Sequence, residues 1–143
     1  FHGNQGSGVG GLGAGCGLSD SFNVVANNVC RENGRWGIEA GGGRNNVISG
    51  NVCLDNSRSA PGRYSGIAVS DSTHTLVTGN RCGTEADKPT QKFGGEETGA
   101  SDHNILTGNL CAGNCDGGLA VVGKNTQVST NLGPVVMRGE RKP

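Results

Sequence analysis

An eight-residue block recurs four times in this chain and constrains its fold more than any other feature. The copies span Asn23–Cys30, Asn46–Cys53, Thr75–Cys82 and Asn104–Cys111, and they begin 23, 29 and 29 residues apart. Repeats of this length are typical of a solenoid, in which each repeat forms one turn and buries its apolar side against its neighbours. The sequence therefore predicts a stack of roughly five coils rather than an ordinary globular core.

A second motif, a Gly followed by apolar residues, begins at Gly37, Gly66 and Gly118. The first two stand nine residues before the start of a block, and the third stands nine residues before Gln127, where a degenerate block begins. Apolar and polar residues alternate in segments such as Val47–Ser49, which suits strands of period two. No window keeps an apolar stripe of period 3.6 long enough for a helix. Each coil is thus expected to hold two or three short strands, and the fold to be all-β.

Equivalent residues of stacked parallel coils lie about 4.8 Å apart. Two columns are expected, an Asn ladder that satisfies the bend of each coil and an inward column of free thiols. Their members are Asn28, Asn51, Asn80 and Asn109 for the first, and Cys30, Cys53, Cys82 and Cys111 for the second. Vertical Cys neighbours have parallel Cβ vectors, which is poor disulfide geometry. Cys16 is expected several rungs from Cys115, too far to bridge it.

In these blocks the chain resembles the right-handed parallel β-helix superfamily, the pectate-lyase-like proteins, whose coils carry a similar pattern of strand, Asn corner and strand. The resemblance covers roughly Gly13 to Thr130 and implies a right-handed parallel β-helix. That fold carries lyases, glycosidases, epimerases, phage tailspikes and plain surface proteins, so the resemblance leaves the activity open.

Composition agrees with a narrow repetitive interior, because a chain with 28 glycines and only five aromatic residues has too few large apolar side chains to fill an ordinary globular core. Residues 1–143 are interpreted as a single β-helix domain from a longer chain, with 131–143 as a C-terminal tail or cap. A formal net charge of zero argues against a nucleic-acid partner. No apolar run approaches the roughly 20 residues of a membrane span. Neither a cofactor nor a metal site is expected, and the protein is expected to be extracellular or at the cell surface.

The two middle coils are longer than the outer ones. Thirteen positions separate the repeat Cys from the next motif Gly in these coils, compared with seven in the outer coils. The extra residues centre on Ser57–Gly62 and Glu85–Thr90. Loops on a rigid scaffold commonly carry binding groups, and paired loops beside one sheet are expected to wall a groove.

Basic and aromatic side chains surround these insertions. The alignment places Arg63 with Lys92, and Tyr64 with Phe93, at shared repeat positions. Cations pair with carboxylates, and aromatic rings pack on the apolar faces of sugars. The predicted substrate-binding residues are Arg35, Trp36, Arg58, Arg63, Lys92 and Phe93. An ordinary exposed surface would show the same residues, and both interpretations stay open.

Two glutamates are candidate catalytic residues. If Ile38 points inward, Glu39 and Glu97 lie on the outward face two rungs apart, about 9.6 Å by strand spacing. That separation is near the upper end for the carboxylates of inverting glycosidases. The same alignment turns Glu96 inward, where an unpaired carboxylate is costly. A bulge that turns both Glu96 and Glu97 outward is therefore expected.

His74 and His103 are expected to stack at one repeat position and, with Tyr64, are candidates for proton transfer. Two functions follow from these patterns. The first is a carbohydrate-active module that binds or cleaves an extended, uronate-containing polysaccharide as a lyase or inverting glycosidase. The second is a non-catalytic extracellular spacer, adhesion or tailspike-like segment, as a homo-oligomer or with further coils stacked on its ends.

Overall fold

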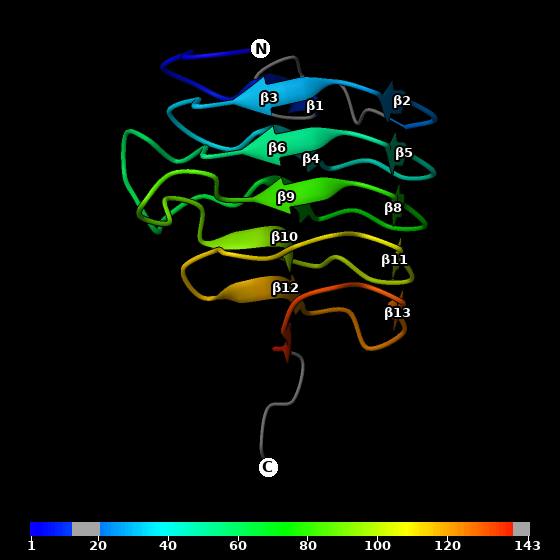
Figure 1. Cartoon of the computed structure of the whole chain (residues 1–143). Helices are drawn as coiled ribbons and strands as arrows, with labels where there is room; N and C mark the ends of the chain where they lie inside the picture. The colour runs from blue at the N-terminus through cyan, green and yellow to red at the C-terminus, as the bar shows by residue number, and fades with distance from the viewer. Residues whose placement is uncertain (13–20, 139–143) are drawn as a thin grey trace.

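The computed structural model describes residues 1–12 and 21–138, which form a stack of parallel strands in three sheets (Figure 1). The six-stranded sheet runs in the order β1 (Val9–Leu12), β4 (Ile38–Gly41), β7 (Ile67–Ser70), β10 (Phe93–Thr98), β12 (Gly117–Val121) and β14 (Val135–Met137). The five-stranded sheet contains β2 (Val24–Ala26), β5 (Val47–Ser49), β8 (Leu76–Thr78), β11 (Ile105–Thr107) and β13 (Gln127–Ser129). The three-stranded sheet contains β3 (Val29–Arg31), β6 (Val52–Leu54) and β9 (Arg81–Gly83).

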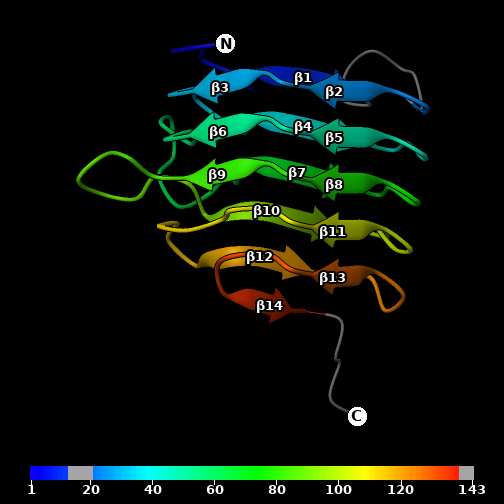
Figure 2. The ribbon, with the colours of Figure 1, turned by 45° about the vertical axis from the view of Figure 1, so that its right-hand side comes forward.

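The predicted right-handed parallel β-helix is confirmed. Every strand pairs in parallel with its equivalent in the next coil, so the chain progresses steadily from the N-terminal to the C-terminal rung (Figure 2). Alternation along the short strands turns every second side chain toward the interior. Ile48 and Val77 fill it from the five-stranded sheet, and Ile38 and Ile67 fill it from the six-stranded sheet.

The Asn ladder forms as predicted, and Asn131 extends it. In each step the side-chain oxygen of the lower Asn accepts the backbone N–H and the side-chain amide of the Asn above it, as in the pair Asn51 and Asn80 at 2.9 and 3.0 Å. The amide of Asn80 also donates to the carbonyl of Ile48 at 2.9 Å. The ladder therefore satisfies buried backbone groups at the bend that water cannot reach.

The cysteine column is also confirmed. In the register of the three-stranded sheet, Cys30 lies beside Cys53, and Cys53 lies beside Cys82. The four thiols of the column are buried and form no disulfide. Glycines of the six-stranded side pack directly against them. A Cβ added to Gly94 would lie 2.6 Å from Cβ of Cys111. The recurring Gly therefore provides the close approach that the two sheets need at this corner.

A further polar ladder, which the sequence analysis did not identify, lies at the base of the insertions. It contains Asn33, Asn56, Gln91 and Asn114. Asn56 donates its side-chain amide to Gln91 at 2.8 Å, and Gln91 donates to Asn114 at 3.0 Å. Because these side chains are stacked through the loop region, the insertions start from fixed points of the scaffold.

The two insertions enter the coil on opposite sides of this ladder. The segment at Ser57–Gly62 follows Asn56, whereas the segment at Glu85–Thr90 precedes Gln91. The third coil is then one residue shorter before its strand, so Gly95 of β10 lies opposite Ile67, and Glu96 lies opposite Ala68. The predicted alignment of Gly95 with Gly66 was wrong by one residue.

Residues 131–138, within the expected C-terminal tail or cap, continue the stack, because β14 pairs with β12 and Asn131 joins the Asn ladder. The prediction for Cys16 lies outside the described residues. The described residues contain no helix long and apolar enough to cross a membrane.

Candidate functional site

Basic and aromatic side chains gather where the chain enters β4, β7 and β10. The edge of Trp36 meets the ring of Tyr64, with 4.6 Å between centroids and an interplanar angle of 70°. The guanidinium carbons of Arg35 and Arg63 lie 5.8 and 5.5 Å from the centroid of Tyr64. The backbone N–H of Lys92 donates to the carbonyl of Tyr64 at 2.8 Å. These five residues are called the basic–aromatic edge.

The insertions hold this edge in place. The N–H of Gly62 donates to the carbonyl of Thr90 at 2.7 Å, so the two loops contact each other. The N–H of Tyr64 donates to the hydroxyl of Ser57 at 3.0 Å, which closes the first loop on itself. The buried carboxylate of Asp55 accepts the N–H of Glu85 at 3.0 Å and so fixes the start of the second loop. Figure 2 shows this second loop projecting from the stack after β9.

Phe93 is not available to a ligand in the way the sequence predicted. The one-residue shift of β10 places Phe93 opposite Ser65 rather than Tyr64, and it places Lys92 opposite Tyr64 rather than Arg63, so both predicted pairings were wrong. Only 2% of the surface of Phe93 is exposed. Two cations cover the ring: Nζ of Lys92 lies 5.7 Å from the centroid, and Cζ of Arg138 lies 4.7 Å from it. Arg138 belongs to the last described coil and was not singled out from the sequence.

The register of β10 changes which carboxylates face outward. Glu96 shares the outward column with Glu39 and Ala68, whereas Glu97 lies opposite Val69 in the interior. The predicted outward pair of Glu39 and Glu97 was therefore wrong, and so was the predicted bulge. No bulge is needed, because the shorter loop shifts the strand by one residue. The outward pair, two rungs apart, is Glu39 and Glu96.

Glu97 is fully buried and acts as an interior acceptor. One carboxylate oxygen accepts the amide of Asn104 at 2.7 Å and the hydroxyl of Thr126 at 2.8 Å. The other accepts the backbone N–H groups of Val122 and Gly123 at 3.2 and 3.0 Å. These four donors replace the hydrogen bonds to water that a buried carboxylate loses, and they compensate for the free energy of its desolvation. The structure thus gives Glu97 a role in tying the turn after β12 to the stack.

His74 and His103 stack as predicted, with ring centroids 5.5 Å apart and planes inclined by 19°. Both residues are exposed and have left-handed backbones, with φ of 54° and 55°. Nδ1 of His103 lies 3.3 Å from the carboxylate of Asp102. Hydrogen bonds from the backbone and side chain of Asn125 lower the pKa of Asp102. The pair occupies the turns before β8 and β11, whereas Tyr64 precedes β7, so these three candidates do not form one site.

Arg58 also lies apart from the basic–aromatic edge. Its guanidinium is 3.6 Å from the carboxylate of Glu32, which His2 and Arg31 also approach. A hydrogen bond from His2 is the main reason why the pKa of Glu32 is lowered. Arg58 therefore belongs to a surface ion-pair network of the N-terminal coils.

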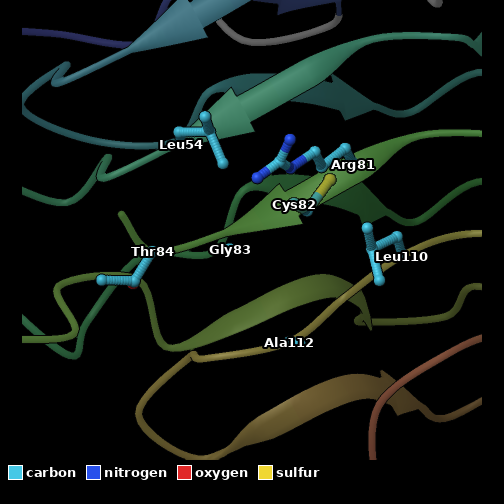
Figure 3. A pocket seen from close by; sticks show the side chains of 7 residues that line it. All are labelled: Leu54, Arg81, Cys82, Gly83, Thr84, Leu110 and Ala112. Atoms are coloured by element: carbon cyan, nitrogen blue, oxygen red, sulfur yellow. The ribbon is translucent and has the colours of Figure 1, made fainter. Parts of the chain in front are cut away.

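A surface hollow of about 130 Å³ lies beside the three-stranded sheet, next to β9 (Figure 3). Leu54 and Leu110 flank it, and Gly83 and Ala112 also line it. A second hollow of about 350 Å³ is lined by Phe22, Arg44 and Asp71. Within residues 1–12 and 21–138, no group of three or more His, Cys, Asp or Glu residues is arranged to hold a metal ion.

Comparison with known proteins agrees with this architecture. The family described as right-handed β-helix region matches residues 1–132 of the chain. No curated protein and no solved structure matches it. The match extends over every coil that carries the basic–aromatic edge.

Proposed function

We propose that this chain, which belongs to the right-handed β-helix family, binds an extended acidic polysaccharide along its basic–aromatic edge. The observation that carries the proposal is the placement of Arg35, Arg63 and Lys92 in three successive coils. Both guanidinium groups lie over the ring of Tyr64, and the backbone of Lys92 is hydrogen bonded to that of Tyr64. Both arginines are exposed, and Tyr64 and Lys92 are half-buried. The cations are thus held on a rigid scaffold while their charged ends remain open to solvent.

The chemistry of this edge suits carboxylated sugars. Guanidinium groups pair with carboxylates through two parallel hydrogen bonds, and aromatic rings cover the apolar faces of sugar rings. Successive coils repeat about every 4.8 Å along the axis. An extended chain that runs parallel to the axis therefore meets a cation at each of three coils.

Binding is favoured over turnover because the candidate catalytic groups are dispersed. Glu97 is an interior acceptor, His74 and His103 occupy another corner, and Ala68 between the outward glutamates is only 1% exposed. Ala68 is therefore covered by its neighbours in the free protein. An acid and a base that converge on one open position are thus lacking among these candidates.

A second candidate function, inverting glycoside hydrolysis, rests on one observation. Glu39 and Glu96 lie in one outward column with a single residue between them. Their strands are two rungs apart, about 9.6 Å, near the upper end of the separation that inverting enzymes use. Turnover would require the side chains over Ala68 to move aside when the polysaccharide binds.

The test is direct binding by isothermal titration calorimetry to polygalacturonate, alginate and hyaluronan, with dextran as a neutral polymer. The variant Arg63→Glu/Lys92→Glu is expected to lose binding to the acidic polymers. Arg44→Glu/Lys124→Glu changes the net charge equally at two exposed residues of other turns and is expected to retain it. Circular dichroism establishes that both variants are folded.

Four outcomes distinguish the functions. Binding lost only in the Arg63/Lys92 variant supports the polysaccharide site, and new reducing ends that vanish in Glu96→Gln support hydrolysis. If the wild-type protein binds none of the acidic polymers, the proposal is overturned and a spacer or adhesion segment is the better description. An equal loss of binding in the two charge-reversal variants would show that binding depends on the overall charge of the protein rather than on the basic–aromatic edge.

A further inference from the structure

We infer that Arg138 is an additional ligand-binding residue and that Glu96 restrains it until a carboxylate of the ligand competes for its guanidinium. This inference rests on the proposed polysaccharide binding and adds a regulated cation to the same site. The sequence separates Arg138 from Lys92 by 46 residues, and the coil brings both to one ring.

The register explains how Arg138 reaches this place. Met137 lies opposite Val121, and the N–H of Arg138 donates to the carbonyl of Val121 at 2.6 Å. The side chain then spans the rung of β12 and meets Phe93 and Glu96 on β10. Ala120, on the rung that is crossed, is fully buried. Arg138 therefore acts as a strap that links β14 to β10 over a small residue.

The contacts hold Arg138 loosely. Its Cζ lies 4.7 Å from the centroid of Phe93, a cation–π contact, and one guanidinium nitrogen lies 3.8 Å from the carboxylate of Glu96. That distance is longer than a hydrogen bond, so the ion pair is Coulombic only. The side chain remains 34% exposed. A guanidinium has five donors, and those of Arg138 are open to a closer anion.

The two cations on Phe93 make this exchange favourable for an acidic ligand. Lys92 belongs to the basic–aromatic edge and shares the ring with Arg138. In the free protein Glu96 offsets one of the two positive charges. A ligand carboxylate that hydrogen bonds to Arg138 gains a charge-assisted contact that Glu96 does not make at 3.8 Å. The binding edge then extends to the coil of β14.

The experiment compares Arg138→Gln, Glu96→Gln and the double variant with the wild-type protein in titrations with whichever acidic polymer the wild type binds. Arg138→Gln is expected to weaken binding about twofold to fivefold, the range for a partly exposed charge contact, and Glu96→Gln is expected to tighten it by a similar factor. In the background of Arg138→Gln, the gain from Glu96→Gln is expected to disappear, since the restrained cation is absent. A long-range charge effect would persist in both backgrounds.

Thermal unfolding of the three variants serves as the control for structure. A purely structural strap would change the melting temperature and leave the affinity of the folded protein unchanged, which would overturn this inference. An equal gain from Glu96→Gln with and without Arg138 would overturn it as well. If the wild-type protein binds but all three variants match it, only this inference fails. If the wild-type protein does not bind, the proposed function fails and this inference with it.

Discussion

The side-chain amide of Asn51 donates to Oδ1 of Asn80 at 3.0 Å, and the same oxygen accepts the backbone N–H of Asn51 at 2.9 Å. The side chain of Asn80 thus satisfies two donors of the coil above. Its own amide donates to Oδ1 of Asn109 and to the carbonyl of Ile48, at 3.0 and 2.9 Å. The residue is 1% exposed, so water cannot replace these contacts.

Replacing Asn80 with Ala is therefore expected to lower the free energy of unfolding by about 1 to 3 kcal/mol, the cost of leaving buried polar groups without partners. Urea denaturation followed by circular dichroism measures it. Asn131→Ala provides a matched control at the half-buried lower end of the ladder, where water reaches the groups left behind. Equal losses in the two variants would contradict the importance of burial.

The ladder thiols are expected to be inaccessible in the folded protein. Cys30, Cys53, Cys82 and Cys111 are at most 1% exposed, whereas Cys115 is exposed. A Cys16→Ser/Cys115→Ser variant leaves only the four ladder thiols, so any reaction with a thiol reagent reports on them. We expect no labelling before denaturant is added and four equivalents afterwards. Rapid labelling of the native variant would show that the column is not buried.

Alkaline pH should destabilise the fold through the same column. Contact with the Cys30 thiol and burial raise the pKa of Cys53 well above the usual value. Contact with Cys111 lowers the pKa of Cys82, but contact with Cys53 and burial outweigh it and raise that pKa well above the usual value. Contact with Cys82 and burial raise the pKa of Cys111, whereas contact with Cys53 lowers that of Cys30, so three of the four thiols are shifted upward. A thiol with a raised folded pKa keeps its proton while the unfolded chain ionises near pH 8.5. Stability is therefore fully present below that pH and falls above it, by at most about 1.4 kcal/mol per pH unit for each thiol.

Urea denaturation at pH 7 and pH 9.5 checks this prediction. Cys82→Ala removes one of the raised thiols and is expected to flatten the pH dependence, although it also lowers the stability at pH 7 by creating a cavity. A stability that is unchanged between the two pH values would show that the column ionises as readily in the folded protein as in the unfolded chain.

The sequence was sufficient for the fold because each eight-residue block contains both a ladder Asn and a column Cys. Whatever register the block adopts, Asn28 through Asn109 and Cys30 through Cys111 stack together. A less regular signal marked the other polar ladder: an Asn stands three residues after Cys30, Cys53 and Cys111. In the third coil six inserted residues move its counterpart, Gln91, out of this spacing.

The candidate site was less predictable because its register depends on a loop. Gly94 and Gly95 are both glycines, so the residue pattern alone permits either to align with Gly66. Energy distinguishes the two alignments. Aligning Gly95 with Gly66 buries the carboxylate of Glu96 without a partner, which is costly. Shifting by one residue brings Glu97 inward instead, where four donors meet it. Those donors come from the next turns, and only the assembled coil identifies them.

Glu97 should consequently matter for stability rather than for catalysis. Glu97→Ala leaves the amide of Asn104, the hydroxyl of Thr126 and two backbone N–H groups without their acceptor, all in the interior or beside it. We expect the free energy of unfolding to fall by about 3 to 5 kcal/mol, the upper range for a single substitution that breaks a buried network. Urea denaturation measures the change.

Glu96→Gln is the matched control on the adjacent residue. Glu96 faces outward but is only 6% exposed, and within the described residues its carboxylate makes one ion pair, with Arg138 at 3.8 Å. Neutralisation removes a largely desolvated charge that no close donor satisfies, so it is expected to lower the free energy of unfolding by less than about 1 kcal/mol. The two neighbouring glutamates should therefore differ strongly, because one lies inside the coil and the other outside. Comparable losses would mean that Glu97 is not the interior acceptor. A large loss of stability for the Glu96 variant alone would show that Glu96, rather than Glu97, points into the coil.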